Sequence, residues 1–232
     1  MLDRSTRFAY YALACFGLPA LTACSAGLAS IAPVDLVPVG PEIVADWRVG
    51  FVPDRHRRYD LRWRFYTPKG STAGRAAIRV APPDSLRFDY RGPFGRSGAA
   101  LVLGDSVIWA EPAKDVRQLI PLAPLFWAAL GIPLAPATAS ITYGRDGARQ
   151  RAWREVAGTD TLDVVHMRGV GERLTTQLRQ GGITAATNVR FGPDGLPIQG
   201  EMRFPKDGAV FIFTVETVDT TVAFDAATWR HP

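Results

Sequence analysis

Apolar and polar side chains alternate along most of the chain from residue 59 onward. A period of two is typical of β-strands with one buried face. The clearest case is residues 86–91, where leucine, phenylalanine and tyrosine alternate with arginine and aspartate. Strands are predicted at residues 61–66, 76–80, 86–91, 99–103, 106–110, 151–156, 161–168, 173–179, 185–191, 196–204 and 209–218. Short strands at roughly 8–12-residue spacing favour a mainly β barrel or sandwich over a fold that alternates strands with helices.

Three dipeptides mark tight turns between these strands: Gly104-Asp105, Asp194-Gly195 and Asp207-Gly208. Glycine beside aspartate tolerates the positive φ angles that two-residue hairpins require. Consecutive strands are therefore predicted to pair antiparallel.

One long segment lacks the alternation, because no charged residue occurs between Arg117 and Arg145. Its core, residues 119–136, contains four prolines, each of which removes a backbone donor and opposes a continuous helix. The proline-free stretch 125–132 spans only about 12 Å as a helix, against a hydrocarbon core of about 30 Å. We predict one or two short apolar helices on a curved sheet. They either fill the core or cover a ligand cavity, since ligand sites concentrate in the mouths of barrels.

The N-terminus has the layout of a secretory signal peptide. Arg4 and Arg7 precede an uncharged stretch at residues 8–23, which is short for a membrane span and contains Pro19. This stretch ends in Leu-Thr-Ala followed by Cys24 and resembles a bacterial lipobox, whose cysteine is acylated. The sequence predicts a signal peptide at residues 1–23 and a lipid, including palmitate, on Cys24. An ordinary signal peptide with a chance cysteine is the alternative.

Residues 24–58 are interpreted as the lipidated N-terminus and a linker. Pro33, Pro38 and Pro41 argue against a helix in the first part of it. Residues 59–232 are predicted to form the folded domain. Cys15 and Cys24 are the chain's two cysteines, so this domain has neither a disulfide framework nor a cysteine-rich metal site.

The composition shows that basic residues outnumber acidic ones. The chain of 232 residues carries a formal charge of +5, with 24 arginines and 3 lysines. Arginines cluster at residues 55–58 and 145–154. A secretory signal argues against a nucleic-acid partner. The clusters are either an ordinary solvated face or contact anionic lipid headgroups.

Residues that could support catalysis are sparse. His56, His166 and His231 show no metal-ligand spacing. Residues 95–98 do not form the nucleophile elbow of a hydrolase, and residues 169–171 lack the third glycine of a dinucleotide loop. We therefore expect a protein that is not an enzyme and holds no metal or cofactor.

Four features together resemble the LolA/LolB superfamily, and within it the LolB-type outer-membrane lipoprotein receptors. A strand runs into an apolar turn over residues 84–95, and a second strand follows at residues 99–103. The segment 119–133 ends in a Gly-x-Pro step, and residues 191–198 resemble a closing turn of the superfamily. The order of these elements, with the lipobox, supports the resemblance.

This resemblance covers residues 59–225 and implies a mainly β (α+β) fold. It implies a curved antiparallel half-barrel of about eleven strands, with short helices covering the concave face. It also implies an apolar cavity that takes the acyl chains of lipoproteins, and a protruding apolar turn residue, here Phe94, that enters the membrane. An inward, core-packed Phe94 is the alternative. The candidate cavity residues are Leu86, Phe88, Tyr90, Leu101, Leu103, Trp109, Leu125, Phe126, Trp127 and Leu130.

Function follows as an expectation from these features. The chain is expected to be anchored by Cys24 in the outer membrane and to face the periplasm. Ser25 favours that membrane over the inner one. It would accept or carry lipoprotein acyl chains, with a periplasmic carrier protein as a further partner. The alternative is an envelope sensor or interaction lipoprotein that uses the same fold without lipid transfer.

Overall fold

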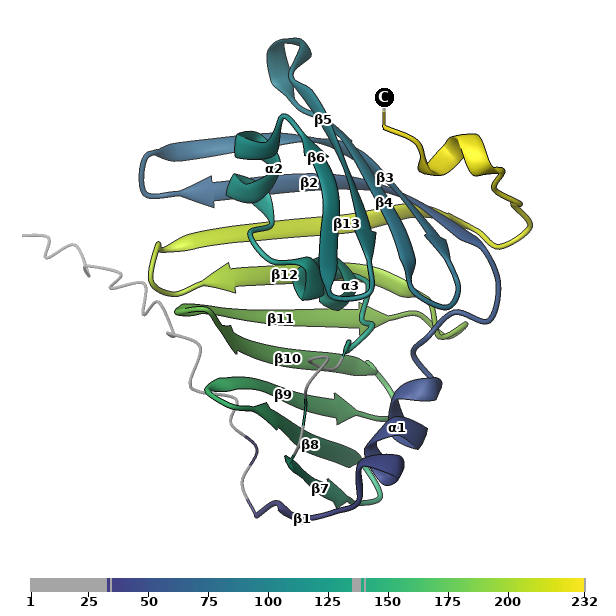
Figure 1. Cartoon of the computed structure of the whole chain (residues 1–232), viewed down its shortest axis with the longest axis vertical. Helices are drawn as coiled ribbons and strands as arrows, with labels where there is room; N and C mark the ends of the chain where they lie inside the picture. Colours follow the sequence, from purple (N-terminus) through teal and green to yellow (C-terminus); the bar gives the residue numbers. More distant parts are fainter. Residues whose placement is uncertain (1–32, 34, 135–138, 140, 232) are drawn as a thin grey trace, which may run out of the picture.

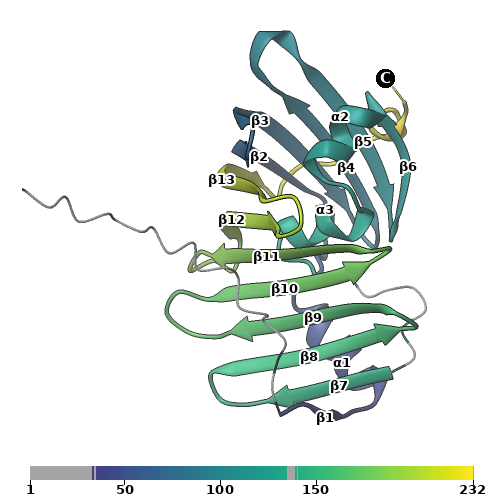
Figure 2. The same ribbon diagram turned by 90° about the vertical axis from the view of Figure 1, so that its left-hand side faces the viewer.

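The computed structural model describes residue 33, residues 35–134, residue 139 and residues 141–231. These residues form one antiparallel sheet of 13 strands, in the order β1-β7-β8-β9-β10-β11-β12-β13-β2-β3-β4-β5-β6 (Figure 1). The sheet is open, with β1 at one edge and β6 at the other. It bends so that β2–β6 and β13 curve around α2 and α3 (Figure 2). The predicted mainly β half-barrel is confirmed, with two more strands than expected.

The strands are β1 (Val37–Pro38), β2 (Arg57–Thr67), β3 (Gly70–Ala81), β4 (Ser85–Arg91), β5 (Ser97–Leu103), β6 (Ser106–Glu111), β7 (Ile141–Asp146), β8 (Gln150–Ala157), β9 (Asp160–Met167), β10 (Arg173–Gln180), β11 (Ile183–Phe191), β12 (Pro197–Phe204) and β13 (Ala209–Asp219). The helices are α1 (Pro41–Val49), α2 (Ala113–Leu119) and α3 (Ala123–Ala129), and the 3₁₀ turns are η1 (Pro93–Gly95) and η2 (Ala226–Trp229).

Each predicted strand overlaps an observed strand, because the alternation of apolar and polar residues shows which residues share a face. The strands β1 and β7 were missed. The first has only two residues, and the second contains Gly144, which has no side chain to display the pattern. A Cβ at Gly144 would lie 2.7 Å from Trp47, so this glycine makes room for an aromatic ring.

The long-range pairing of β13 with β2 joins the two halves of the sheet. Val210 lies opposite Tyr66 and Phe213 opposite Trp63, although about 150 residues separate these strands in the chain. Hairpin signals do not reveal this contact. It arises because both strands bury large apolar side chains on the same face.

The inner, concave face of the sheet holds the hydrophobic core. Cross-strand register puts one apolar row after another on this face, and the short helices pack over it. The largest buried side chains here include Tyr59, Phe88, Trp153, Leu174 and Met202. Fully burying a side chain of this size contributes about 1.5–3 kcal/mol.

Part of the segment interpreted as a linker is folded onto the sheet. The prolines there predicted no helix, which is wrong for α1, because Pro41 occupies the first turn, where its missing donor costs nothing. Val44 is completely buried, and the Trp47 ring lies 6.0 Å from that of Trp153. Residues 37–49 therefore contribute to the core. The predicted signal peptide and Cys24 lie outside the described residues.

Candidate functional site

The inner face is covered by α3, whose seven residues are all buried. Proline in its first turn starts the helix, and Gly131 at φ +74° ends it. A Cβ at Gly131 would lie 2.4 Å from the Phe191 ring, so glycine is needed both for the backbone angle and for the close approach. Within the described part of the chain, no helix has the length and apolar character that crossing a membrane requires.

Contacts between α3 and the sheet are almost entirely apolar. The rings of Phe126 and Phe88 meet edge to face at 5.5 Å. Trp127 has the one polar side chain in the helix, and its Nε1 donates to the carbonyl oxygen of Gly104 at 2.8 Å. A single directional bond therefore supplements a surface of non-directional packing.

Seven of the ten predicted cavity residues meet at this interface, as buried side chains. They come from β4 and from the segment around α3: Leu86, Phe88, Tyr90, Leu125, Phe126, Trp127 and Leu130.

The other three predicted cavity residues lie on the opposite, outer face, which corrects the predicted lining. Leu101 pairs with Arg87 and Leu103 with Ser85, whereas Phe88 pairs with Ala100. Trp109 pairs with Leu101. Residues 99–103 are all apolar, so the sequence could not show which alternate set faces inward. Small residues fill the inner side of this strand.

The pocket next to α3 is small. A pocket of about 240 Å³ opens at the C-terminal end of the helix, between Phe51, Tyr59, Leu130, Ile132 and Phe191. Pockets that hold small ligands usually measure about 300–1,000 Å³. This pocket is below that range, and the buried side chains of α3 fill the inner face beside it.

Phe94 projects from the tip between β4 and β5, at the top of Figure 1. Its side chain is 100 % exposed, which excludes the alternative of a core-packed ring. Its φ of 58° is unusual for a residue other than glycine and costs on the order of 1 kcal/mol. The neighbours Pro93 and Gly95 shape this turn. The backbone thus holds a large apolar ring in solvent.

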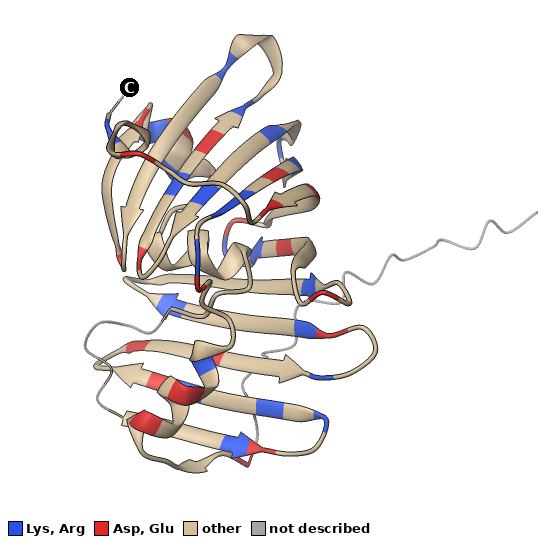
Figure 3. Ribbon diagram, turned by 90° about the vertical axis from the view of Figure 1, so that its right-hand side faces the viewer, with Lys and Arg blue, Asp and Glu red and all other residues tan. Residues whose placement is uncertain are grey.

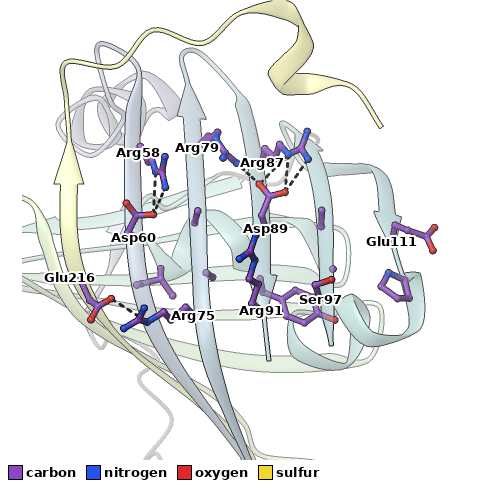
Figure 4. Close-up of a pocket in the computed structure, with 17 residues that line it drawn as sticks. Arg58, Asp60, Arg75, Arg79, Arg87, Asp89, Arg91, Ser97, Glu111 and Glu216 are labelled. Carbon is purple, nitrogen blue, oxygen red and sulfur yellow. Dashed lines mark hydrogen bonds and ion pairs between the residues drawn. The ribbon is translucent and has the colours of Figure 1, made fainter. Parts of the chain in front are cut away.

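A groove of about 870 Å³ crosses the outer face of β2–β6 and β13 (Figure 4). Its floor is low because Ala77 and Ala99 stand between longer side chains. Cross-strand register arranges the surrounding side chains in three parallel rows. The middle row consists of aspartate and alanine side chains, and a row rich in arginine lies on each side of it. Basic and acidic residues are interleaved over much of the sheet (Figure 3).

Every arginine in one basic row, which contains Arg58, Arg79 and Arg87, is paired with an aspartate. Arg58 lies 2.9 Å from Asp60, and Arg87 lies 3.0 Å from Asp89. Arg79 also binds Asp89, as the dashed lines of Figure 4 show.

Most arginines of the two clusters seen in the sequence also have an acidic partner. In the first cluster, Arg57 lies 3.6 Å from Asp54. In the second, Arg151 lies 2.8 Å from Asp146, and hydrogen bonding to this guanidinium lowers the pKa of Asp146. Arg55 shares Asp54 with Arg57, and Arg149 has no ion pair with any described residue, so this pairing is only partial.

Glu155 is a buried carboxylate under α1 that the sequence did not single out. It is 2 % exposed and lies 3.4 Å from Arg48 of α1. Its Oε2 has no hydrogen-bond partner among the described residues. Burial raises the pKa of Glu155 above 4.5, although Arg48 opposes the shift. Glu155 therefore holds its proton more tightly in the folded state than a solvated glutamate does.

Glu155→Gln is expected to flatten the pH dependence of stability. A folded-state pKa above the unfolded one contributes stability below pH 4.5, and this contribution is lost as pH rises through the folded-state pKa. The measurement is the urea midpoint of the parent and the variant from pH 4.5 to neutral pH. The control Glu201→Gln, on the outer face, should keep the parental slope. Equal slopes in parent and Glu155→Gln would contradict the expectation.

Among the described residues, no group of three or more histidine, cysteine, aspartate or glutamate side chains could hold a metal ion. The side chain of His166 makes structural contacts. Its Nε2 lies 2.7 Å from Glu172, and its ring meets Phe51 edge to face. His56 accepts a hydrogen bond from the backbone nitrogen of Phe224.

Comparison with solved structures gives similarities at low sequence identity. A domain described as an outer membrane lipoprotein-sorting protein, from Vibrio parahaemolyticus, is 7 % identical with a TM-score of 0.43, over 81 % of this chain and 94 % of that one. A LolA superfamily protein from Nitrosomonas europaea is 9 % identical with a TM-score of 0.38, over 83 % and 98 %. MucB is 13 % identical with a TM-score of 0.38, over 83 % and 64 %.

One of these similar structures is described as a LolA superfamily protein. No protein-family model and no curated protein matches the sequence.

Proposed function

We propose that this protein binds acyl chains, those of lipoproteins in the first instance, between the inner face of its sheet and α3. The observation that supports this most directly is the way in which α3 covers the inner face of the sheet. The helix α3 buries seven residues on an apolar sheet and makes one side-chain hydrogen bond. Apolar packing is non-directional, so an acyl chain can replace it, and the bond from Trp127 to Gly104 is the one side-chain hydrogen bond of α3 that opening breaks.

The energetics of exchange favour a long apolar ligand. Displacing α3 exposes apolar surface of the sheet, and each acyl CH₂ that takes its place recovers about 0.8 kcal/mol. The hydrogen bond from Trp127 to Gly104 adds a net cost of about 1 kcal/mol to opening. A short ligand cannot offset these costs, whereas a lipoprotein acyl chain can.

The exposed Phe94 and the predicted lipid on Cys24 support a role at a membrane. We propose that Cys24 anchors the protein in the outer membrane, facing the periplasm, and that Phe94 enters the acyl boundary during transfer. Aromatic side chains suit that boundary. A periplasmic carrier protein would supply the cargo. No covalent step is needed, so we propose a carrier or acceptor and not an enzyme.

The test is photolabelling of the full chain in lipid vesicles with a lipopeptide whose acyl chain carries a diazirine. Adducts are mapped by mass spectrometry. The proposal expects adducts in β4 and α3, which face each other. Adducts confined to the tip around Phe94 would show membrane contact without acyl binding. Absence of adducts from both regions would refute the proposal.

Trp127→Phe is expected to increase acyl labelling of β4 by about fivefold, because a bond worth about 1 kcal/mol no longer holds α3 closed. The control is Trp63→Phe. This ring is also buried, but its Nε1 has no hydrogen-bond partner among the described residues. Equal labelling in Trp127→Phe and the parent would argue against α3 as a cover that opens.

The second candidate function is an envelope sensor or interaction lipoprotein. It is favoured by the complete burial of α3 and the small space beside it. In that case α3 is permanent core, and photolabelling yields no inner-face adducts in either Trp127→Phe or the parent.

A further inference from the structure

Three arginines stand side by side on the outer face of neighbouring strands. Arg62 of β2 lies opposite Arg75 of β3, and Arg75 lies opposite Arg91 of β4. Directly opposed side chains have Cβ atoms about 4.5–5.5 Å apart, so like charges repel there. We call Arg62, Arg75 and Arg91 the arginine row.

A single carboxylate accompanies this row. Glu216 sits at the irregularity in pairing between Val215 and Thr217 of β13, where a bulge re-aims a side chain. It binds Arg62, and its Oε2 lies 3.9 Å from Nε of Arg75. Arg62 and Arg75 nevertheless remain 65 % and 70 % exposed.

Arg91 completes the excess of positive charge. Its side chain is exposed and has no ion pair with any described residue, and Figure 4 shows it without a dashed line. The row thus has three guanidinium groups and one carboxylate, whereas the Arg58 row on the other side of the groove is paired with Asp60 and Asp89.

The row ends at the tip that carries Phe94. Arg91 is the last residue of β4, three residues before Phe94, and the exposed Arg96 stands just after the tip. The groove beside Arg75 and Arg91 leaves room for a bound group above Ala77 and Ala99. An apolar ring and unpaired guanidinium groups are therefore adjacent, the arrangement that an anionic membrane surface complements.

We propose that the arginine row binds the phosphate groups of anionic membrane lipids while Phe94 lies among their acyl chains. Guanidinium groups bind phosphate through paired hydrogen bonds, which their planar shape permits. Membrane entry of Phe94 is part of the proposed function, on which this inference rests. The arginine row determines which class of lipid the tip prefers. It also orients the groove toward the membrane.

The experiment places a photoreactive benzoylphenylalanine at position 94 of the full chain in vesicles. One set of vesicles contains phosphatidylcholine alone, and the other also contains phosphatidylglycerol. Lipid adducts at position 94 are quantified in the otherwise unchanged chain and with Arg75→Gln plus Arg91→Gln. We expect phosphatidylglycerol to raise adduct formation roughly tenfold and the double substitution to remove that gain.

The matched control is Arg173→Gln plus Arg190→Gln. These two exposed arginines are also opposed across neighbouring strands on the outer face, but on β10 and β11, far along the sheet from the tip. The control removes the same charge and should keep the phosphatidylglycerol effect. Unchanged circular dichroism establishes that both double variants fold.

The outcomes separate this inference from the proposed function. Adducts that form equally with and without phosphatidylglycerol would overturn the inference and leave membrane entry of Phe94 intact. An equal loss in the control would also overturn it, because net charge and not the row would then be responsible. Absence of adducts in every vesicle would refute membrane entry itself, and the inference with it.

Discussion

Cys24→Ala is expected to abolish incorporation of labelled palmitate. The lipobox cysteine supplies the sulfur and the new N-terminus to which acyl chains attach, and alanine offers no sulfur. Cys24 follows Leu-Thr-Ala at the end of the uncharged N-terminal stretch. The measurement is metabolic labelling of the full chain in a bacterial host, followed by mass determination of the processed protein.

The chain provides a matched control in its other cysteine. Cys15 lies inside the predicted signal peptide, so Cys15→Ala should keep full labelling. Since two lipid signals already give stable anchoring, the Cys24→Ala chain should also lose the acyl-dependent part of its membrane attachment. Label that persists in Cys24→Ala, or that disappears in Cys15→Ala, would contradict the predicted lipobox.

Phe88→Ala is expected to lower the free energy of unfolding by about 3–5 kcal/mol. Phe88 is 1 % exposed and packs beneath α3 against Phe126, so truncation leaves a cavity that the sheet cannot close. The measurement is the urea midpoint of unfolding, with the slope compared to confirm that the same surface unfolds.

Leu103→Ala is the control, because Leu103 was predicted to line the same cavity as Phe88. The register places it on the other face, and it is 39 % exposed. The substitution should change stability by no more than about 0.5 kcal/mol. Comparable losses in the two variants would contradict the assignment of faces.

Local patterns predicted the strands well. The alternation of apolar and polar residues located β2–β6 and β8–β13, because a strand with one buried face has an apolar residue at every second position. The proline-rich apolar segment was correctly interpreted as short helices. The same reasoning failed for α1, since a proline that opposes a helix interior also starts a helix.

The candidate site was predicted in part for the same reason. Phe88 and Tyr90 alternate with charged residues, so their face was evident. Leu101 stands in an all-apolar strand, so its face was not. The exposure of Phe94 agrees with the expected protruding turn residue, although the sequence alone left an inward ring open.

The sequence by itself located eleven of the 13 strands of the described sheet, showed the excess of arginine and predicted a lipid anchor, because each of these depends on residues close together in the chain. Only the tertiary structure decided which arginines lie side by side. Most arginines of the clusters visible in the sequence pair with nearby acids, whereas Arg62, Arg75 and Arg91 come together through pairing of three strands. Charge balance depends on distances of a few ångströms between side chains, and strand register sets those distances.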